Sequence, residues 1–131
     1  MTKEINSLTL AYLGDSIYEI YIRLFLIKKG IRKVKELQKE SINFVSAKNQ
    51  AKFLSNILEQ NILTQEEIDV VYRARNHKSH SSKSTDIITY KYATALEALI
   101  GYLYLENNIK KIEEIMNIIL GEKICIYMEK M

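Results

Sequence analysis

Apolar residues recur at helical spacing along most of the chain. Between residues 8 and 29 this pattern predicts a first amphipathic helix. Lys28 and Lys29 suit the negative C-terminal end of a helix dipole, and Gly30 suits the position just beyond it. The apolar positions of this predicted helix include Leu8, Tyr12, Ile17, Tyr21, Leu24 and Phe25.

The same periodicity predicts more helices and no strand. Thr64 and Glu67 have the spacing of a capping box, and Thr85 or Asp86 is suited to cap a later helix. No segment alternates apolar and polar residues as a half-buried strand does. We therefore expect an all-α fold of several packed helices. The further predicted helices cover a short segment at 33–38 and longer segments at 41–60, 65–75, 87–106 and 110–129.

Gly14 and Asp15 stand in the middle of the first predicted helix. Glycine inside a helix costs about 1 kcal/mol relative to alanine. In one interpretation the helix continues, and Asp15 shares a face with Ala11 and Glu19. In the other, Ser16 and Glu19 form a capping box, and Gly14-Asp15 is the turn before a helix that begins at Ser16. The pattern alone leaves both interpretations open.

A second carboxylate lies in apolar surroundings. Glu97 stands within YATALEALIGYLYL, residues 92–105, and Thr94 and Gly101 make its helix face small. We expect a buried helix with one inward carboxylate. If this helix crosses the first one there, Asp15 and Glu97 would offer oxygen ligands to a hard cation. Mg²⁺ needs only one or two protein carboxylates, and it activates water for attack on a phosphate.

Composition places the chain among compact single domains. It has 131 residues, of which 47% are hydrophobic and none is proline, so we expect one domain over 1–131. The single cysteine, Cys125, favours a reducing compartment and is expected to be a small core residue. The first residues do not resemble a signal peptide, and charge interrupts every apolar run before the ~20 residues that a membrane span needs. We expect a cytoplasmic protein without a membrane partner.

The net charge of +3 is mild, but its distribution is uneven. No acidic residue occurs between Tyr72 and Thr85. Cations on phosphates release counterions, so this segment would dock a polyanion. A solvated loop is the other interpretation. The basic residues of the segment are Arg73, Arg75, Lys78 and Lys83, accompanied by His77 and His80.

Several of these stretches resemble the ribonuclease III family. LAYLGDSIYE, residues 10–19, resembles the signature helix LExLGDxxLE of its catalytic domain, and ALEALIGYLYL resembles the second signature, DxxEAxIGAxYL. VSAKNQA at 45–51 and RARNHKSHSSKSTDIITYKYAT at 73–94 match in the same order. The resemblance is closer to the small branch, Mini-ribonuclease III, which lacks a domain for binding double-stranded RNA. Ala11 and Thr94 stand where full-length members have acidic residues, a reduction that the small branch shares.

The resemblance implies a ribonuclease III-type endonuclease domain that forms a homodimer. Each subunit would cut one strand of double-stranded RNA and leave 5′-phosphates, with Mg²⁺ as the cofactor. Asp15 and Glu97 would be both the catalytic residues and the metal ligands. Thr94 and Glu19 are candidates for contacts just outside the coordination sphere. In the small branch the substrate is the precursor of large-subunit (23S) ribosomal RNA, which a ribosomal protein is a candidate to present.

RNA contacts are expected to follow the duplex backbone. A-form RNA is recognised mostly by shape, phosphates and 2′-hydroxyls, so we expect little base readout. Lys48, within VSAKNQA, is a weaker candidate for such a contact, and an exposed helix lysine is the other interpretation. We do not expect His77 or His80 to act as a general base. The RNA contacts implied by the resemblance are Arg73, Arg75, Lys78 and Lys83.

Two other functions remain open from the sequence. The missing acidic residues motivate a non-catalytic member of the same fold that only binds double-stranded RNA. A helical interaction protein without an RNA role is the third reading, in which both carboxylates are structural. Metal-dependent cleavage of double-stranded RNA would distinguish the endonuclease from these two alternatives.

Overall fold

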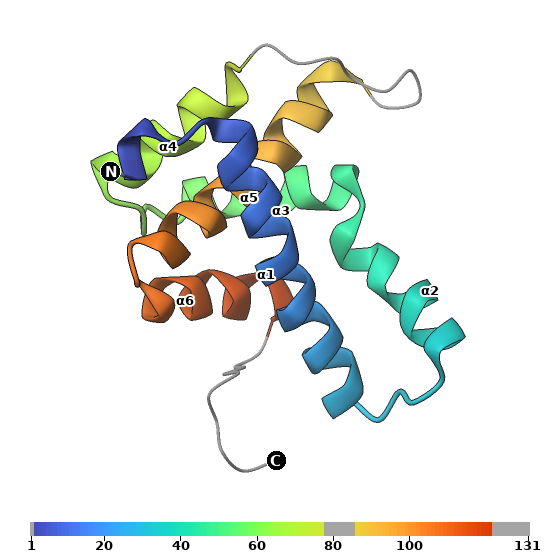
Figure 1. The fold of residues 1–131 in the computed structure, drawn as a ribbon. Helices are drawn as coiled ribbons and strands as arrows, with labels where there is room; N and C mark the ends of the chain where they lie inside the picture. Colours follow the sequence, from blue (N-terminus) through green and yellow to red (C-terminus); the bar gives the residue numbers. More distant parts are fainter. Residues whose placement is uncertain (1, 78–85, 122–131) are drawn as a thin grey trace.

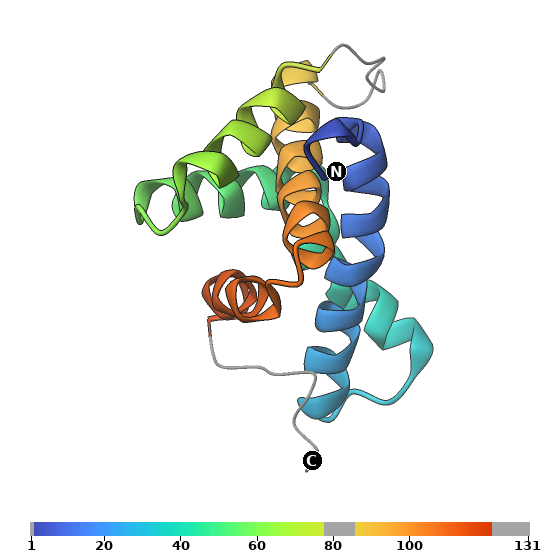
Figure 2. The same ribbon diagram turned by 60° about the vertical axis from the view of Figure 1, so that its left-hand side comes forward.

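A computed structural model describes residues 2–77 and 86–121 of the chain. These residues form helices and no strand, which confirms the predicted all-α fold (Figures 1 and 2). None of the described helices is long and apolar enough to cross a membrane. The elements are a short 3-10 helix η1 (Thr2–Glu4) and the α-helices α1 (Ser7–Lys28), α2 (Val34–Val45), α3 (Ala47–Glu59), α4 (Gln65–Arg75), α5 (Ile87–Leu105) and α6 (Ile109–Leu120).

Local capping explains where several helices begin. Before α4, the Thr64 hydroxyl accepts from the Glu67 backbone at 3.2 Å, and the Glu67 carboxylate accepts from the Thr64 backbone at 2.9 Å. Before α5, the Asp86 carboxylate accepts from the Thr89 backbone N–H at 2.9 Å. The predicted starts of both helices are confirmed. The helix predicted over 110–129 is described only to its cap at Gly121, and the prediction for Cys125 lies outside the described residues.

For residues 33–60, the predicted position of the break between two helices is wrong. We expected an interruption near residue 40, but α2 continues to Val45 and the chain breaks at Ser46. Ser46 has φ −64° and ψ 146°, and its hydroxyl accepts from the Asn49 backbone at 3.2 Å. The Asn49 side chain also donates to the carbonyl of Asn43 at 2.9 Å, which ties the start of α3 to the end of α2. A single capping serine inside a continuous apolar pattern does not disturb the periodicity.

α1 passes through Gly14 and Asp15 without a break. The interpretation in which a helix begins at Ser16 is therefore wrong. The Ser16 hydroxyl donates to the Leu13 carbonyl at 2.7 Å instead of capping a new helix. Gly14 therefore lies inside a continuous helix, and its presence there has to be explained by contact with another part of the fold.

That explanation is the crossing of α1 and α5, the most extensive helix contact among the described residues. Figure 1 shows α5 crossing α1, and Figure 2 shows the two side by side. A Cβ atom on Gly14 would lie 1.7 Å from the carbonyl oxygen of Glu97. A Cβ atom on Gly101 would lie 2.0 Å from the carbonyl oxygen of Leu10. The two backbones approach so closely that only glycine fits at either position.

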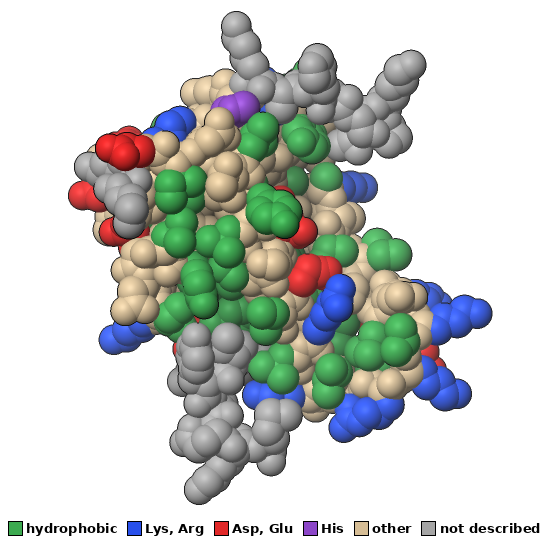
Figure 3. Space-filling model, viewed as in Figure 1, with side chains coloured by type: hydrophobic (Ala, Val, Ile, Leu, Met, Phe, Trp, Pro, Cys, Tyr) green, Lys and Arg blue, Asp and Glu red, His purple; other side chains and the backbone are tan. Residues whose placement is uncertain are grey.

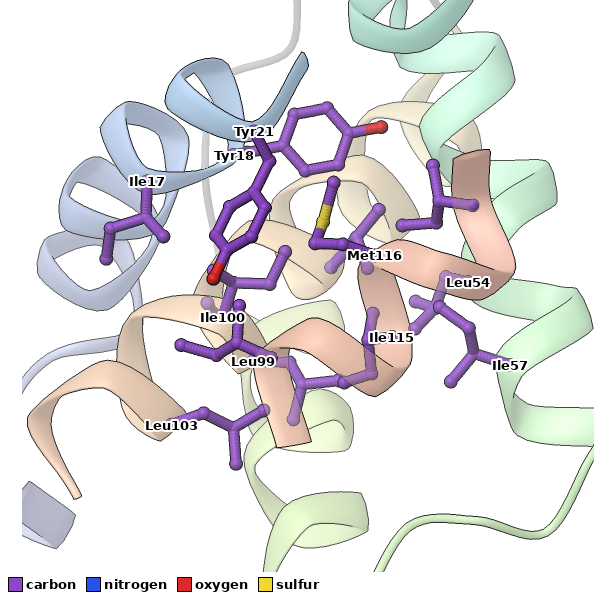
Figure 4. Close-up of a cluster of buried hydrophobic side chains, with 14 of the residues drawn as sticks. Ile17, Tyr18, Tyr21, Leu54, Ile57, Leu99, Ile100, Leu103, Ile115 and Met116 are labelled. Carbon is purple, nitrogen blue, oxygen red and sulfur yellow. The ribbon is translucent and has the colours of Figure 1, made fainter. Parts of the chain in front are cut away.

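The hydrophobic core forms around this pair of helices. α3, α4 and α6 pack on α5, whereas α2 lies at the side of α1 and buries no residue completely (Figure 1). The hydroxyl of Tyr18 donates to the Phe44 carbonyl at 2.6 Å and joins α1 to α2. Figure 4 shows the centre of the core, where α1, α3, α5 and α6 contribute Ile17, Tyr18, Tyr21, Leu54, Ile57, Leu99, Ile100, Leu103, Ile115 and Met116.

We expect Gly101→Ala to lower the free energy of unfolding by about 3 kcal/mol or more. Overpacking a core usually costs about 1–3 kcal/mol, and here the added methyl group meets backbone atoms that cannot rotate away. Urea denaturation measures the loss. The exposed Ser55→Ala in α3 is the control and should change stability by no more than about 0.5 kcal/mol. Equal stability of the two variants would contradict the close backbone contact.

Candidate active site

The crossing of α1 and α5 brings the two predicted carboxylates together. Asp15 follows Gly14, whose backbone packs against the carbonyl of Glu97. Asp15 is exposed to solvent, whereas Glu97 is partly buried. The two side chains are close enough for Asp15 to act on Glu97 both by hydrogen bonding and by its charge. The structure therefore places the pair at one point, and their roles as metal ligands stay a prediction.

The surroundings make it difficult for Glu97 to ionise. Burial raises the pKa of Glu97 to about 8, with further upward contributions from the hydrogen bond to Asp15 and its charge, and from the more distant charge of Glu19. Gln50 acts in the opposite direction, since its side-chain amide donates to Oε2 of Glu97 at 3.3 Å. Without a cation, these surroundings therefore favour the protonated form of Glu97.

Glu19 adds a third carboxylate one turn further along α1. One of its oxygens, Oε2, is buried and accepts no hydrogen bond, although it lies 3.7 Å from Nε of Arg23. Arg23 is largely exposed, which limits the strength of this ion pair. Among the described residues, no group of three or more His, Cys, Asp or Glu side chains is arranged to hold a metal ion.

These oxygens fit a hard divalent cation. Mg²⁺ prefers oxygen ligands and is commonly held by one or two carboxylates, with other oxygens completing its octahedron. Asp15 and Glu97 supply such a pair, and the pKa of Glu97 is raised first by burial and then by Asp15 and the charge of Glu19. A cation held by Asp15 and Glu97 would favour the ionised form of Glu97.

Gln50 is the residue at this site that the sequence reasoning missed. Only Lys48 was singled out within VSAKNQA, yet Gln50 is 4% exposed and contacts Glu97 from α3. The signal was available, because Gln50 lies at helical spacing before Leu54 and Ile57 on the buried face of α3. A polar residue on an apolar helix face is a candidate for a specific hydrogen bond.

Three of the predicted RNA-binding residues lie on α3 and at the end of α4. Arg73 is exposed and Arg75 is partly buried in the last turn of α4. The guanidinium of Arg75 lies 4.6 Å from the ring centroid of Tyr72 and 5.9 Å from that of Tyr92. Lys48 is exposed in the first turn of α3. Lys78, Lys83 and His80 lie outside the described residues, and His77 is described with a buried Nδ1 that has no hydrogen bond.

Two adjoining hollows share Ile88 and Tyr92 at the start of α5. One of about 500 Å³ opens toward α3, and one of about 320 Å³ opens toward the end of α4. Tyr92 precedes Glu97 by five residues, which is about 7.5 Å along a helix axis. We call the two hollows together the basic groove. Its basic lining residues are Lys48, Lys52, Arg75 and Lys91.

Comparison with known proteins shows the family of the chain. The family model of the ribonuclease III domain matches residues 8–108. The chain is 43% identical over 116 residues to the Mini-ribonuclease 3 of Staphylococcus aureus, covering 88% of this chain and 87% of that protein. It is 49% identical over 112 residues to the Mini-ribonuclease 3 of Brevibacillus brevis, covering 85% and 82%.

A solved structure agrees over almost its full length. The crystal structure of a protein from Fusobacterium nucleatum superposes with a TM-score of 0.82 at 34% sequence identity, covering 90% of this chain and 95% of that one. The family match spans both signature helices and the crossing between them. The chain therefore belongs to the ribonuclease III family of endoribonucleases, among the proteins called Mini-ribonuclease 3.

Proposed function

We propose that the chain, over residues 1–131, is one catalytic domain that cleaves double-stranded RNA with Mg²⁺. The meeting of Asp15 and Glu97 at the glycine crossing carries this proposal. The ribonuclease III family acts on double-stranded RNA and generally uses a divalent metal ion. The choice of Mg²⁺ is supported by the carboxylate oxygens of Asp15 and Glu97, which are the kind of ligand that this hard cation prefers.

Asp15 and Glu97 would hold the metal ion, each through carboxylate oxygens. When bound, Mg²⁺ supplies an activated water and stabilises charge on the phosphate under attack. Glu97 must lose its proton to serve as a ligand, and the Gln50 amide favours that ionised form. Glu19 lies one turn beyond Asp15 and would interact with the coordinated waters, as would Thr94. The products would carry 5′-phosphates and 3′-hydroxyls.

The basic groove would bind the RNA backbone beside the site. The guanidinium of Arg75 contacts the rings of Tyr72 and Tyr92, so it would lose little freedom on binding a phosphate. Lys48 lines the groove itself, whereas Arg73 lines a separate hollow with Glu66 and Asp69. Arg73 remains proposed as a further RNA contact, as are Lys78 and Lys83 from the segment outside the described residues. Since A-form RNA is read by shape, these contacts would confer little preference for sequence.

The active form is proposed to be a homodimer. Figure 3 shows hydrophobic side chains gathered over α1, with acidic side chains near its middle. Tyr12 is 81% exposed and Ile20 is 54% exposed, which is unusual for large apolar residues on a helix that otherwise packs in the core. Two copies joined through this face would bring their Asp15 residues toward one duplex, so that each site cuts one strand. The exposed apolar residues of α1 are Leu8, Tyr12, Ile20 and Ile27.

The proposed biological role is maturation of the 23S ribosomal RNA precursor in the cytoplasm, with a ribosomal protein presenting the RNA. This part rests on the resemblance to the small branch of the family. The competing proposal is a protein that binds double-stranded RNA without cutting it. It is favoured by Ala11 and Thr94, both buried, where full-length members carry acidic residues.

Asp15→Asn should lower the cleavage rate by about 100-fold or more while duplex binding is kept. Loss of a residue that merely orients a metal ligand commonly reduces metal affinity or activity by about 10–100-fold. Loss of the ligand itself should therefore reduce activity by about 100-fold or more. The assay uses labelled duplex RNA with Mg²⁺ or EDTA, and a single-stranded RNA as comparison. Asp69→Asn, at an exposed position of α4, is the matched control and should cleave like wild type. Wild-type protein that binds the duplex but leaves it intact in Mg²⁺ would establish the binding-only alternative.

Glu97→Gln should stabilise the metal-free protein at high pH. Because the pKa of Glu97 is raised from 4.5 to about 8, the folded protein binds this proton more tightly than the unfolded chain, and stability is lost as pH rises between these values. A glutamine keeps a donor for Asp15 and an acceptor for Gln50 and never ionises. Urea denaturation in EDTA should show a gain of a few kcal/mol at pH 9 and little change at pH 5, since one pKa unit is worth about 1.4 kcal/mol.

The control for this measurement is Glu59→Gln at an exposed position of α3, which should have the same small effect at both pH values. Equal pH dependence of wild type and Glu97→Gln would show that Glu97 ionises normally.

Arg75→Gln should weaken binding to duplex RNA by a similar factor for every sequence. Removing one phosphate contact should also reduce the slope of log affinity against log salt concentration by about one. Fluorescence anisotropy in EDTA measures binding without cleavage. Lys39→Gln, on the exposed surface of α2, is the control for loss of one positive charge. An unchanged salt slope for Arg75→Gln would remove Arg75 from the RNA interface.

A further inference from the structure

Gln50 is a buried polar side chain that reaches the site from a third helix. It is 4% exposed and lies on the face of α3 that also buries Leu54 and Ile57. Its Nε2 lies 3.3 Å from Oε2 of Glu97, and the two residues are 47 positions apart in the chain. Burying an amide costs free energy unless it makes such a hydrogen bond. The amide therefore has to be explained by what it contacts, which is the carboxylate of Glu97.

The start of α3 holds Gln50 in place. Its backbone N–H donates to the carbonyl of Ser46 at 2.9 Å in the first turn of the helix. Ser46 caps that turn through the Asn49 backbone, and the Asn49 side chain donates to Asn43 of α2. These bonds set the direction of the first turn of α3. The side chain that points from this turn into the α1–α5 crossing is that of Gln50.

A neutral amide is well suited to hold a ligand carboxylate. It donates a hydrogen bond to one oxygen and leaves the second oxygen available to a cation. A lysine or arginine in its place would neutralise the charge that attracts the cation. An amide adds no charge, so it orients the carboxylate without competing with the metal. Groups that orient ligands in this way commonly contribute 10–100-fold to metal affinity.

We propose that Gln50 is a positioning residue for Glu97: its side-chain amide fixes one oxygen of the Glu97 carboxylate and thereby orients the other toward a divalent cation shared with Asp15. This inference rests on the proposed function, in which Asp15 and Glu97 hold the metal ion. It extends the site from two helices to three. The break between α2 and α3 also has a role in this proposal, because it sets the direction of the first turn of α3 and thereby the position of Gln50.

The test is the affinity of the wild-type chain and Gln50→Met for Mn²⁺, a paramagnetic substitute for Mg²⁺ whose free form is counted by electron paramagnetic resonance. Methionine is close to glutamine in length and fills the same space without donating a hydrogen bond. We expect the Mn²⁺ affinity of Gln50→Met to fall by about 10-fold or more. RNA affinity in EDTA should be unchanged, and cleavage should recover as the Mg²⁺ concentration is raised. Gln60→Met, at the exposed end of the same helix, is the control and should match wild type.

The outcomes separate this inference from the proposed function. Wild-type protein that binds Mn²⁺ and cleaves RNA, together with a Gln50→Met variant of equal metal affinity, would overturn the role of Gln50 and leave the function intact. Wild-type protein that neither binds Mn²⁺ nor cleaves duplex RNA would overturn both. A further effect of Gln50→Met on Mn²⁺ affinity in a Glu97→Gln background would also contradict the inference, because Gln50 is proposed to act only through Glu97.

A measurement on the wild-type chain avoids any folding defect of the variant. The side-chain NH₂ group of Gln50 gives its own pair of nuclear magnetic resonance signals. During a titration with Mg²⁺ these signals should shift, with the same midpoint as the backbone signal of Asp15. The side-chain signals of the exposed Gln60 should not move. Gln50 signals that stay fixed while the Asp15 signal shifts would overturn the proposal.

Discussion

The close contact between the backbones of α1 and α5 is the constraint on which the rest of the structure depends. Gly14 and Gly101 each face a carbonyl of the opposite helix at a distance that excludes any side chain. Each glycine costs helix stability on its own, about 1 kcal/mol relative to alanine. The packing of two largely apolar helices offsets this cost, and the core then forms from the helices that pack around them. The same contact determines where Asp15 and Glu97 lie, because each is on the crossing or next to it.

The crossing creates an electrostatic conflict at its edge. Glu97 is partly buried beside Asp15 and within reach of the charge of Glu19, and these surroundings oppose its ionisation. A site chosen only for stability would replace Glu97 with an apolar residue or with glutamine. Strongly perturbed carboxylates of this kind are typical of functional sites. In the proposed site a divalent cation would resolve this conflict, and the Gln50 amide partly opposes it by favouring the ionised form of Glu97.

α5 would connect the proposed RNA contacts with the proposed metal site. Its first turns carry Tyr92, which lies against the guanidinium of Arg75 from α4, and its middle carries Glu97. Because both are on one continuous helix, the separation between the basic groove and the carboxylates is rigid. The aromatic contacts of Arg75 keep its guanidinium at a defined place, which suits the proposed contact with phosphate. α2, which buries no residue completely, is joined to this unit by Tyr18 and by the link between Asn49 and Asn43.

The sequence by itself determined the features that depend on residues close together along the chain. The capping box of Thr64 and the cap at Asp86 set the starts of α4 and α5, because a cap involves residues three positions apart. Apolar periodicity predicted the all-α fold, and the resemblance pointed to Asp15 and Glu97. Only the tertiary structure decided whether Gly14 was a turn or a crossing point, where the chain breaks at Ser46, and that Gln50 contacts Glu97. Those outcomes depend on residues far apart in sequence that meet only when the helices pack, and no local pattern records which faces will touch.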